Sequence, residues 1–206
     1  MVSLNFFLAH AVSDYSFTNP MKLYGNSDWK DLSKHALWSV LVFLAFSFDV
    51  VFSSALSVII FTFALVLHFV IDYLRMRKIN SWVVEGFSIV AFLIYSAVFS
   101  YLFENSFITS YFSLYLIGMI FVSVIPTQIM RMTGIISELE AESEGISERL
   151  AMFVFICADK PLYAILTVLI AFVYRKIIKK EFNKSWWISP LLGFTIPWFF
   201  RFIIFG

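Results

Sequence analysis

Long apolar runs constrain this chain more than any other feature. Residues 50–73, 81–103 and 107–130 are predominantly apolar. About 20 apolar residues in a helix span the hydrocarbon core of a bilayer, and a helix satisfies its own backbone hydrogen bonds without water. The runs therefore predict an all-α polytopic membrane protein.

The composition supports the same class. The chain is 61% hydrophobic and 14% charged, whereas soluble domains are roughly half apolar and a quarter charged. The formal net charge of +1 says nothing about nucleic acid, but no basic stripe suggests such a partner, so we expect none. The single cysteine, Cys157, excludes an intrachain disulfide, and residues 1–15 lack the pattern of a secretory signal, so we expect none. The expected partner is the lipid bilayer.

We expect about five to seven membrane helices in one integral membrane domain, residues 1–206. The first is a short N-terminal helix, and Pro126 is expected to kink a later one. Apart from the hairpin described next, the expected helices cover residues 2–18, 32–48, 50–73, 81–103, 107–130 and 186–206.

Two segments depart from a simple series of spans. Residues 147–174 are apolar but are interrupted by Asp159-Lys160-Pro161, which predicts a broken helical hairpin. Residues 134–146 are acidic, with interspersed isoleucine and leucine, and predict a short cytoplasmic surface helix. That acidic helix is a candidate contact for a partner protein or for a second copy in a homo-oligomer.

Basic loops set the expected orientation. Arg75, Arg77 and Lys78 form one basic loop, and residues 175–184 form a second. Such loops prefer the cytoplasm, and both reach it only if residues 147–174 enter and return as a hairpin. We therefore expect a multi-pass protein of the bacterial inner (plasma) membrane.

Histidines and acids recur at helical spacing within these apolar segments. His10 precedes Asp14, and His68 precedes Asp72, by four residues, which places each pair on one helix face. His35 begins another span, at the same expected cytoplasmic depth. Ionisable residues inside a membrane are functional candidates, and this donor set suits zinc, or manganese or iron. We predict a divalent metal site; the alternative is a set of polar residues that fix helix packing.

Three further residues are candidates for catalysis. Glu85 begins a span from the cytoplasmic side and would act as a ligand, an orienting group or a general base. Arg149 would hold an anionic phosphate or carboxylate, with Glu148 beside it. The alternative for Arg149 is an interfacial side chain that extends to water.

The order of these motifs resembles a known family. The chain is similar to the domain-of-unknown-function family 3307 of bacterial and phage membrane proteins, and more distantly to YdjM-type membrane-bound metal-dependent hydrolases. The chain departs from the family pattern at Thr18, where the family has a glutamine, and after Glu85, where a family histidine is missing. The matching elements are His10-x-x-x-Asp14-Tyr15, Met21, His35, His68-x-x-x-Asp72 and Gly145-Ile146-Ser147-Glu148-Arg149-Leu150.

Two functions stay open. The resemblance implies an inner-membrane metal-dependent hydrolase with its site near the cytoplasmic face and a phosphoester or lipid-type substrate. The alternative is a non-enzymatic membrane module, such as a phage- or defence-linked effector, a sensor or an ion-path protein, in which the same polar cluster is structural. The departures from the family pattern favour the alternative.

Overall fold

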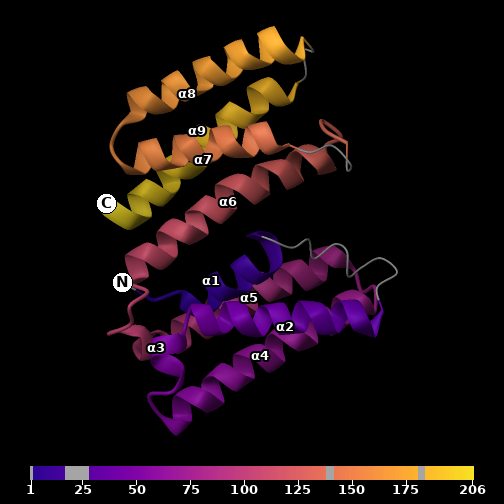
Figure 1. Ribbon diagram of the computed structural model, residues 1–206, viewed down its shortest axis with the longest axis vertical. Coiled ribbons are helices and arrows are strands. Elements are labelled where there is room, and N and C mark those ends of the chain that lie inside the picture. Colours follow the sequence, from indigo (N-terminus) through magenta and orange to yellow (C-terminus); the bar gives the residue numbers. More distant parts are fainter. Residues whose placement is uncertain (1, 17–27, 138–141, 181–183) are drawn as a thin grey trace. The chain divides into compact units, whose positions relative to one another are not determined.

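A computed structural model shows the chain as a set of helices joined by turns (Figure 1). The structure describes residues 2–16, 28–137, 142–180 and 184–206. Within these residues there are nine α-helices and no strand, which confirms the all-α prediction. The chain divides into two compact units, Met1–Leu114 and Tyr115–Gly206.

The first unit is built around its short N-terminal helix. Every residue of α1 (Asn5–Ala11) is buried, and a π-helical turn, η1 (Val12–Ser16), continues it. The helix packs against α2 (Trp29–Ala45) and α5 (Ser81–Val98), while α4 (Ala55–Met76) packs against both α2 and α5. The expected short N-terminal helix is therefore the centre of this unit.

Polar contacts fix α1 along its own axis. Asn5 donates from Nδ2 to the carbonyl of Ile108 at 3.1 Å and accepts from the hydroxyl of Ser113 at 2.7 Å. The hydroxyl of Ser96 on α5 accepts from the backbone N–H of Phe7 at 2.7 Å. Buried polar groups need partners. These bonds therefore fix the position of α1 along its axis, and with it the position of η1, which follows α1 directly.

Short elements and caps complete the first unit. Asp28 caps α2, and Ser54 caps α4, each accepting a backbone N–H of the first turn. The remaining elements are α3 (Phe48–Val51), η3 (Ser100–Phe103) and the first turn of α6 (Ser110–Met132), which has Pro126 in its interior.

The second unit contains the predicted hairpin. The helices α7 (Ser143–Cys157) and α8 (Pro161–Tyr174) pack against each other and are joined by a turn in which Asp159 has a φ of 59°. Proline at the first position of α8 suits a helix start. A short π-helical segment, η4 (Arg175–Lys179), follows, and α9 (Ser185–Phe205) packs against α7.

Five described helices are long and apolar enough to cross a membrane: α4, α5, α6, α8 with its continuation to Ile178, and α9. Large apolar side chains cover their outer faces, such as Phe63 and Ile170. This pattern makes the chain a multi-pass membrane protein. The helices α2 and α7 are shorter, with 17 and 15 residues.

The described residues at the start of the acidic segment do not form the predicted surface helix. Residues 133–137 form a turn and a bend rather than a helix, beginning at Gly134 with a φ of 69°. Glu138, Glu140 and the residues between them lie outside the described residues, and α7 begins at Ser143. The left-handed glycine ends α6, because such a conformation stops a helix.

Candidate metal centre

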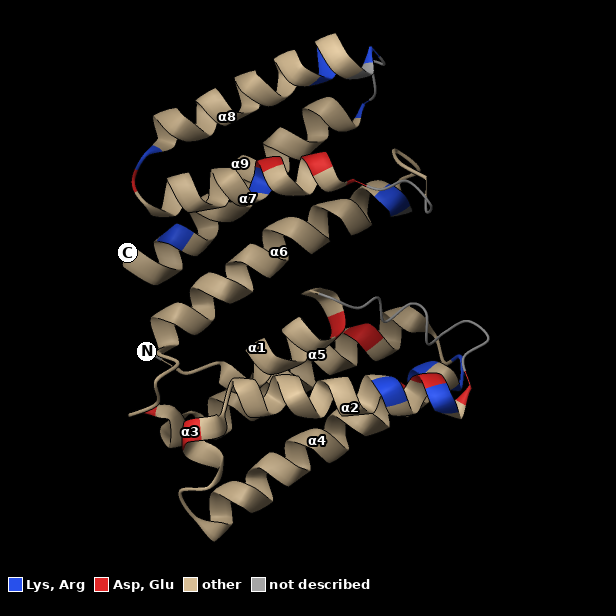
Figure 2. Ribbon diagram, in the orientation of Figure 1, with Lys and Arg blue, Asp and Glu red and all other residues tan. Residues whose placement is uncertain are grey.

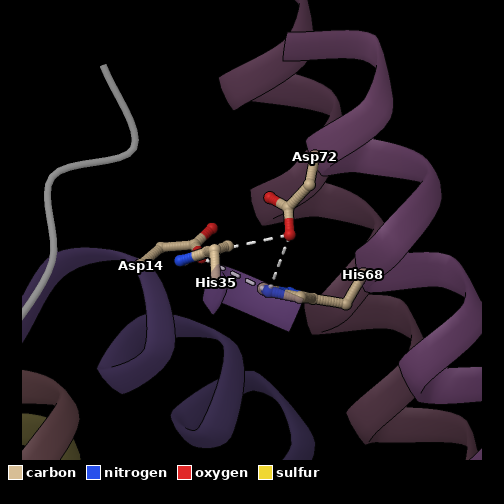
Figure 3. A group of neighbouring side chains, drawn as sticks. All are labelled: Asp14, His35, His68 and Asp72. Carbon is tan, nitrogen blue, oxygen red and sulfur yellow. Dashed lines mark hydrogen bonds and ion pairs between the residues drawn. The ribbon is translucent and has the colours of Figure 1, made fainter. Parts of the chain in front are cut away.

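Four of the predicted ligands converge inside the first unit. Figure 3 shows that they point toward one another from η1, α2 and α4. One ligand atom from each lies within 4.8 Å of the others. The four residues are Asp14, His35, His68 and Asp72.

Local structure explains how three segments reach one point. His68 and Asp72 lie four residues apart on α4 and share its inner face. Asp14 sits in the π-helical turn η1, a rare conformation that is frequent at functional sites. His35, on the second turn of α2, completes the group.

The spacing of the donor atoms fits co-ligands better than hydrogen-bond partners. Nε2 of His35 lies 3.3 Å from Oδ1 of Asp14 and 3.4 Å from Oδ2 of Asp72. Nε2 of His68 lies 3.5 Å and 3.4 Å from the same two oxygens. An N–H···O bond is typically about 2.9 Å long. Ligands at about 2.0–2.1 Å around a tetrahedral metal are about 3.4 Å apart.

Arg75 holds the far side of both carboxylates. Its Nη1 lies 2.7 Å from Oδ2 of Asp14 and 2.7 Å from Oδ1 of Asp72. Each carboxylate therefore gives one oxygen to the guanidinium and turns the other toward the histidines. This is how an outer group orients metal ligands.

Glu85 continues the network. Nε and Nη2 of Arg75 donate to its two carboxylate oxygens, each at 2.9 Å, and the Tyr15 hydroxyl donates to Oε2 at 2.5 Å. Burial, together with the Glu85 carboxylate, raises the pKa of Tyr15 above its ordinary value, so the phenol keeps its proton.

Charged groups crowd together in this cluster. Asp14, Asp72 and Glu85 all lie against the guanidinium of Arg75. The side chains of Asp14, Asp72 and Arg75 are all 0% exposed. Buried charge is costly unless it is paired or binds a metal, and two buried carboxylates beside two imidazoles are a donor set that suits a divalent cation.

His10 lies behind the converging group rather than within it. Its Nδ1 is 3.1 Å from Nδ1 of His68, and its ring stacks on Phe92 with centroids 4.3 Å apart. Its Nε2 has no hydrogen-bond partner among the described residues. The structure therefore places His10 where it orients His68, and its predicted role as a ligand remains a prediction.

Two residues of this cluster escaped sequence reasoning. Arg75 was assigned to a basic loop, but it lies on α4 and its side chain is fully buried. Ser39 places its hydroxyl 2.9 Å from Nε2 of His68. Helical spacing is the sequence feature that could have identified both residues, because Arg75 follows Asp72 by three residues and Ser39 follows His35 by four.

Arg149, on α7 in the second unit, is buried in a fully bonded network. Nη1 and Nη2 donate to the two carboxylate oxygens of Glu142 at 2.6 and 3.1 Å. Its side chain is 0% exposed and does not extend to water. The remaining acceptors are Ser189, Thr127 and the carbonyls of Val122 and Ser123. An anion at Arg149 would have to displace one of these groups.

Glu148 pairs with a different arginine. Its Oε2 accepts a hydrogen bond from Nη2 of Arg175, and its side chain is 1% exposed. Burial raises the pKa of Glu148 above its ordinary value, although Arg175 opposes the shift. Glu148 and Arg149 belong to the unit of residues 115–206, so their predicted catalytic roles remain predictions.

Fold and site together define a multi-pass helical membrane protein with a buried His/Asp cluster suited to a metal ion. No protein-family model, curated protein or solved structure matches the chain. The resemblance to family 3307 and to YdjM-type hydrolases therefore stays a prediction.

Proposed function

We propose that the chain is a membrane-bound metal-dependent hydrolase whose metal is held by Asp14, His35, His68 and Asp72. The supporting observation is the set of four N···O separations between 3.3 and 3.5 Å. These separations are long for hydrogen bonds and match the spacing of tetrahedral ligands. Two imidazoles and two carboxylates suit zinc, with manganese and iron as the next choices.

The surrounding residues suit a hydrolytic reaction. A bound divalent metal lowers the pKa of water toward neutrality and polarises an ester oxygen. His35 is the most exposed of the four ligands, at 9% of its side chain, and marks the edge that a substrate would approach. Glu85, 14% exposed and held by Arg75 and Tyr15, would accept the proton.

The family resemblance supports the substrate class, and the basic residues after α4 support the location of the site. The resemblance to YdjM-type proteins points to a phosphoester or a lipid-type substrate. The basic residues Arg77 and Lys78 follow α4 directly, which supports a location of the cluster near the cytoplasmic face of a bacterial inner membrane.

A closed ligand set favours a second function. All four donors are protein side chains and at most 9% exposed. Structural zinc sites have four protein ligands, whereas catalytic sites keep one position open. In this alternative the metal ties η1, α2 and α4 together in a non-enzymatic membrane module, such as an effector, a sensor or an ion-path protein.

Metal analysis of the purified full chain tests the shared premise. We expect about one zinc-class ion per chain, and a near-complete loss in His68→Ala. Asp159→Asn, which alters an exposed acid of the second unit, is the matched control and should keep the metal. Wild-type protein without stoichiometric metal, or unchanged content in His68→Ala, would refute the site.

Turnover separates the two functions. Phosphodiester or lipid-ester hydrolysis that is lost in Glu85→Gln, while the metal content is retained, would support the hydrolase. Stoichiometric metal without hydrolysis, together with membrane depolarisation on expression, would select the non-enzymatic module.

A further inference from the structure

A pocket in the second unit opens between α7 and α8, outside the metal cluster. Its volume is about 450 Å³. Glu144, Ser147 and Glu148 of α7 form a polar wall, Ile170 and Tyr174 of α8 form an apolar wall, and Arg175 lies at the end. The pocket therefore presents charge on one side and hydrocarbon on the other.

Glu148 is incompletely bonded in this wall. Its Oε2 accepts from Arg175, but its buried Oε1 has no hydrogen-bond partner among the described residues. A buried acceptor without a donor is costly, and more so when it carries charge. The pocket thus contains an acceptor suited to a ligand with N–H or O–H donors.

Arg175 contributes the opposite charge. One of its guanidinium nitrogens, Nη2, donates to Glu148, and its other N–H groups have no acceptor among the described residues. Guanidinium groups bind phosphate oxygens through charge-assisted bonds. One ligand that carries an ammonium group near a phosphate would satisfy both residues.

The position of the pocket indicates the source of that ligand. The candidate span Pro161–Ile178 ends beside it, where Arg175 and Lys176 begin a basic segment. Figure 2 shows that α8 has no charged residue along its length, and charge appears only beyond its ends. Ile170 and Val173 are 69% and 53% exposed on this helix. An acyl chain would follow this surface while its head group lies in the pocket.

We propose that this pocket binds a primary ammonium group joined to a phosphodiester, the chemistry of an ethanolamine phospholipid head group. The ammonium donates to Oε1 of Glu148, and the phosphodiester accepts from Arg175. The acyl chains lie along α8. This inference does not rest on the proposed hydrolase function.

The proposal makes a sharp distinction between head groups. A primary ammonium has three N–H donors, whereas the trimethylammonium of choline has none. Choline lipid would leave Oε1 of Glu148 without a donor, and glycerol lipid would bring no positive charge. A charge-assisted hydrogen bond of this kind changes affinity by about tenfold or more.

Lipid binding to the purified full chain tests the proposal without any variant. Native mass spectrometry would compare phosphatidylethanolamine, phosphatidylcholine and phosphatidylglycerol with matched acyl chains. We expect phosphatidylethanolamine to bind about tenfold more tightly than phosphatidylcholine. Equal binding of these two lipids would overturn the proposal.

Variants then assign the preference to the pocket. In Glu148→Gln the preference should fall to about threefold or less, because the carboxylate charge is lost while the side-chain volume is kept. Asp159→Asn, at the other end of the hairpin and 2.8 Å from Arg201, should retain it. A preference that survives Glu148→Gln would overturn the assignment.

A soluble head-group molecule tests whether the pocket binds the head group alone or requires a membrane lipid. Glycerophosphoethanolamine has the same ammonium and phosphodiester without acyl chains. If it competes with the lipid at equal concentration, the head group alone carries the binding. If it does not compete while the lipid preference holds, the ligand is a membrane lipid held also by α8.

Discussion

The two units bury charged residues in different ways. In the first, Asp14 and Asp72 share one guanidinium, and their second oxygens lie 3.3–3.5 Å from imidazole nitrogens. In the second, Arg149 meets one carboxylate and four other acceptors at 2.6–3.2 Å. Both clusters cross several helices, but the first holds imidazole nitrogens and carboxylate oxygens at separations longer than an ordinary hydrogen bond, whereas the second is hydrogen-bonded throughout.

This difference separates a ligand site from a structural tie. A fully paired arginine network specifies how helices pack and gains nothing from an added ion. A cluster of imidazoles and carboxylates with long donor separations is suited to a cation. Burial and charge alone do not distinguish the two clusters, whereas the donor types and the distances do.

The largest expected effect is loss of the structural tie. Arg149→Met removes the guanidinium and leaves the Glu142 carboxylate without its counter-charge, with only the Thr127 hydroxyl, among the described residues, still donating to it. Breaking a buried pair in this way costs about 3–5 kcal/mol, which thermal unfolding of the purified protein would measure. Arg201→Met is the control, because its partner Asp159 is 75% exposed and such a pair contributes about 1 kcal/mol or less. Similar losses in both variants would contradict the comparison.

Metal removal should affect the other cluster. At a free metal concentration of about 100 times the dissociation constant, binding stabilises the chain by about 2.7 kcal/mol. A chelator should therefore lower the unfolding midpoint of the wild type but not of His68→Ala. Folded Arg149→Met should still respond. A chelator effect that persists in His68→Ala would place the metal elsewhere.

His10→Phe should weaken the metal site without abolishing it. Phenylalanine keeps the stacked contact with Phe92 but loses the bond from His10 to Nδ1 of His68. Loss of an outer hydrogen bond to a ligand typically reduces metal affinity by about 10–100-fold. Competition with a fluorescent zinc chelator would measure the change. Complete loss of binding would show that His10 is itself a ligand, as the sequence predicts.

The fold was largely predictable because apolar length alone sets most of its helices. The run at residues 50–73 became α4, and Asp159-Lys160-Pro161 became the turn of the hairpin. The central position of α1 was not predictable, since it depends on bonds such as those of Asn5 to Ile108 and Ser113. Those partners lie more than 100 residues away, beyond any local pattern.

The candidate site was predictable in its ligands but not in its surroundings. Helical spacing predicted the pairing of His68 with Asp72. Ionisable side chains inside a membrane are energetically costly, and this cost made His35 and Asp14 candidates for the site. The same reasoning counted Arg75 as an orientation signal, because basic residues cluster at the ends of spans. Only the three-dimensional arrangement shows that its side chain faces two carboxylates instead of water.

The smallest expected effect tests competition between a hydrogen bond and the metal. The Ser39 hydroxyl lies 2.8 Å from the carbonyl of His35 and 2.9 Å from Nε2 of His68, and when it donates its one proton to the carbonyl it accepts from Nε2. A nitrogen that binds a metal has no proton to donate. Ser39→Ala should therefore remove about 1 kcal/mol from the metal-free state alone and raise the metal affinity about fivefold.

Chelator competition on Ser39→Ala measures this rise. Ser88→Ala is the matched control, because the buried Ser88 hydroxyl donates only within α5, to the carbonyl of Glu85 at 2.8 Å. That control should leave the metal affinity unchanged. A lower affinity in Ser39→Ala would mean that the serine supports the bound state, and that His68 does not use Nε2 for the metal. The direction of this small change thus identifies the coordinating nitrogen of His68, because Nε2 can bind the ion only when it carries no proton to donate to Ser39.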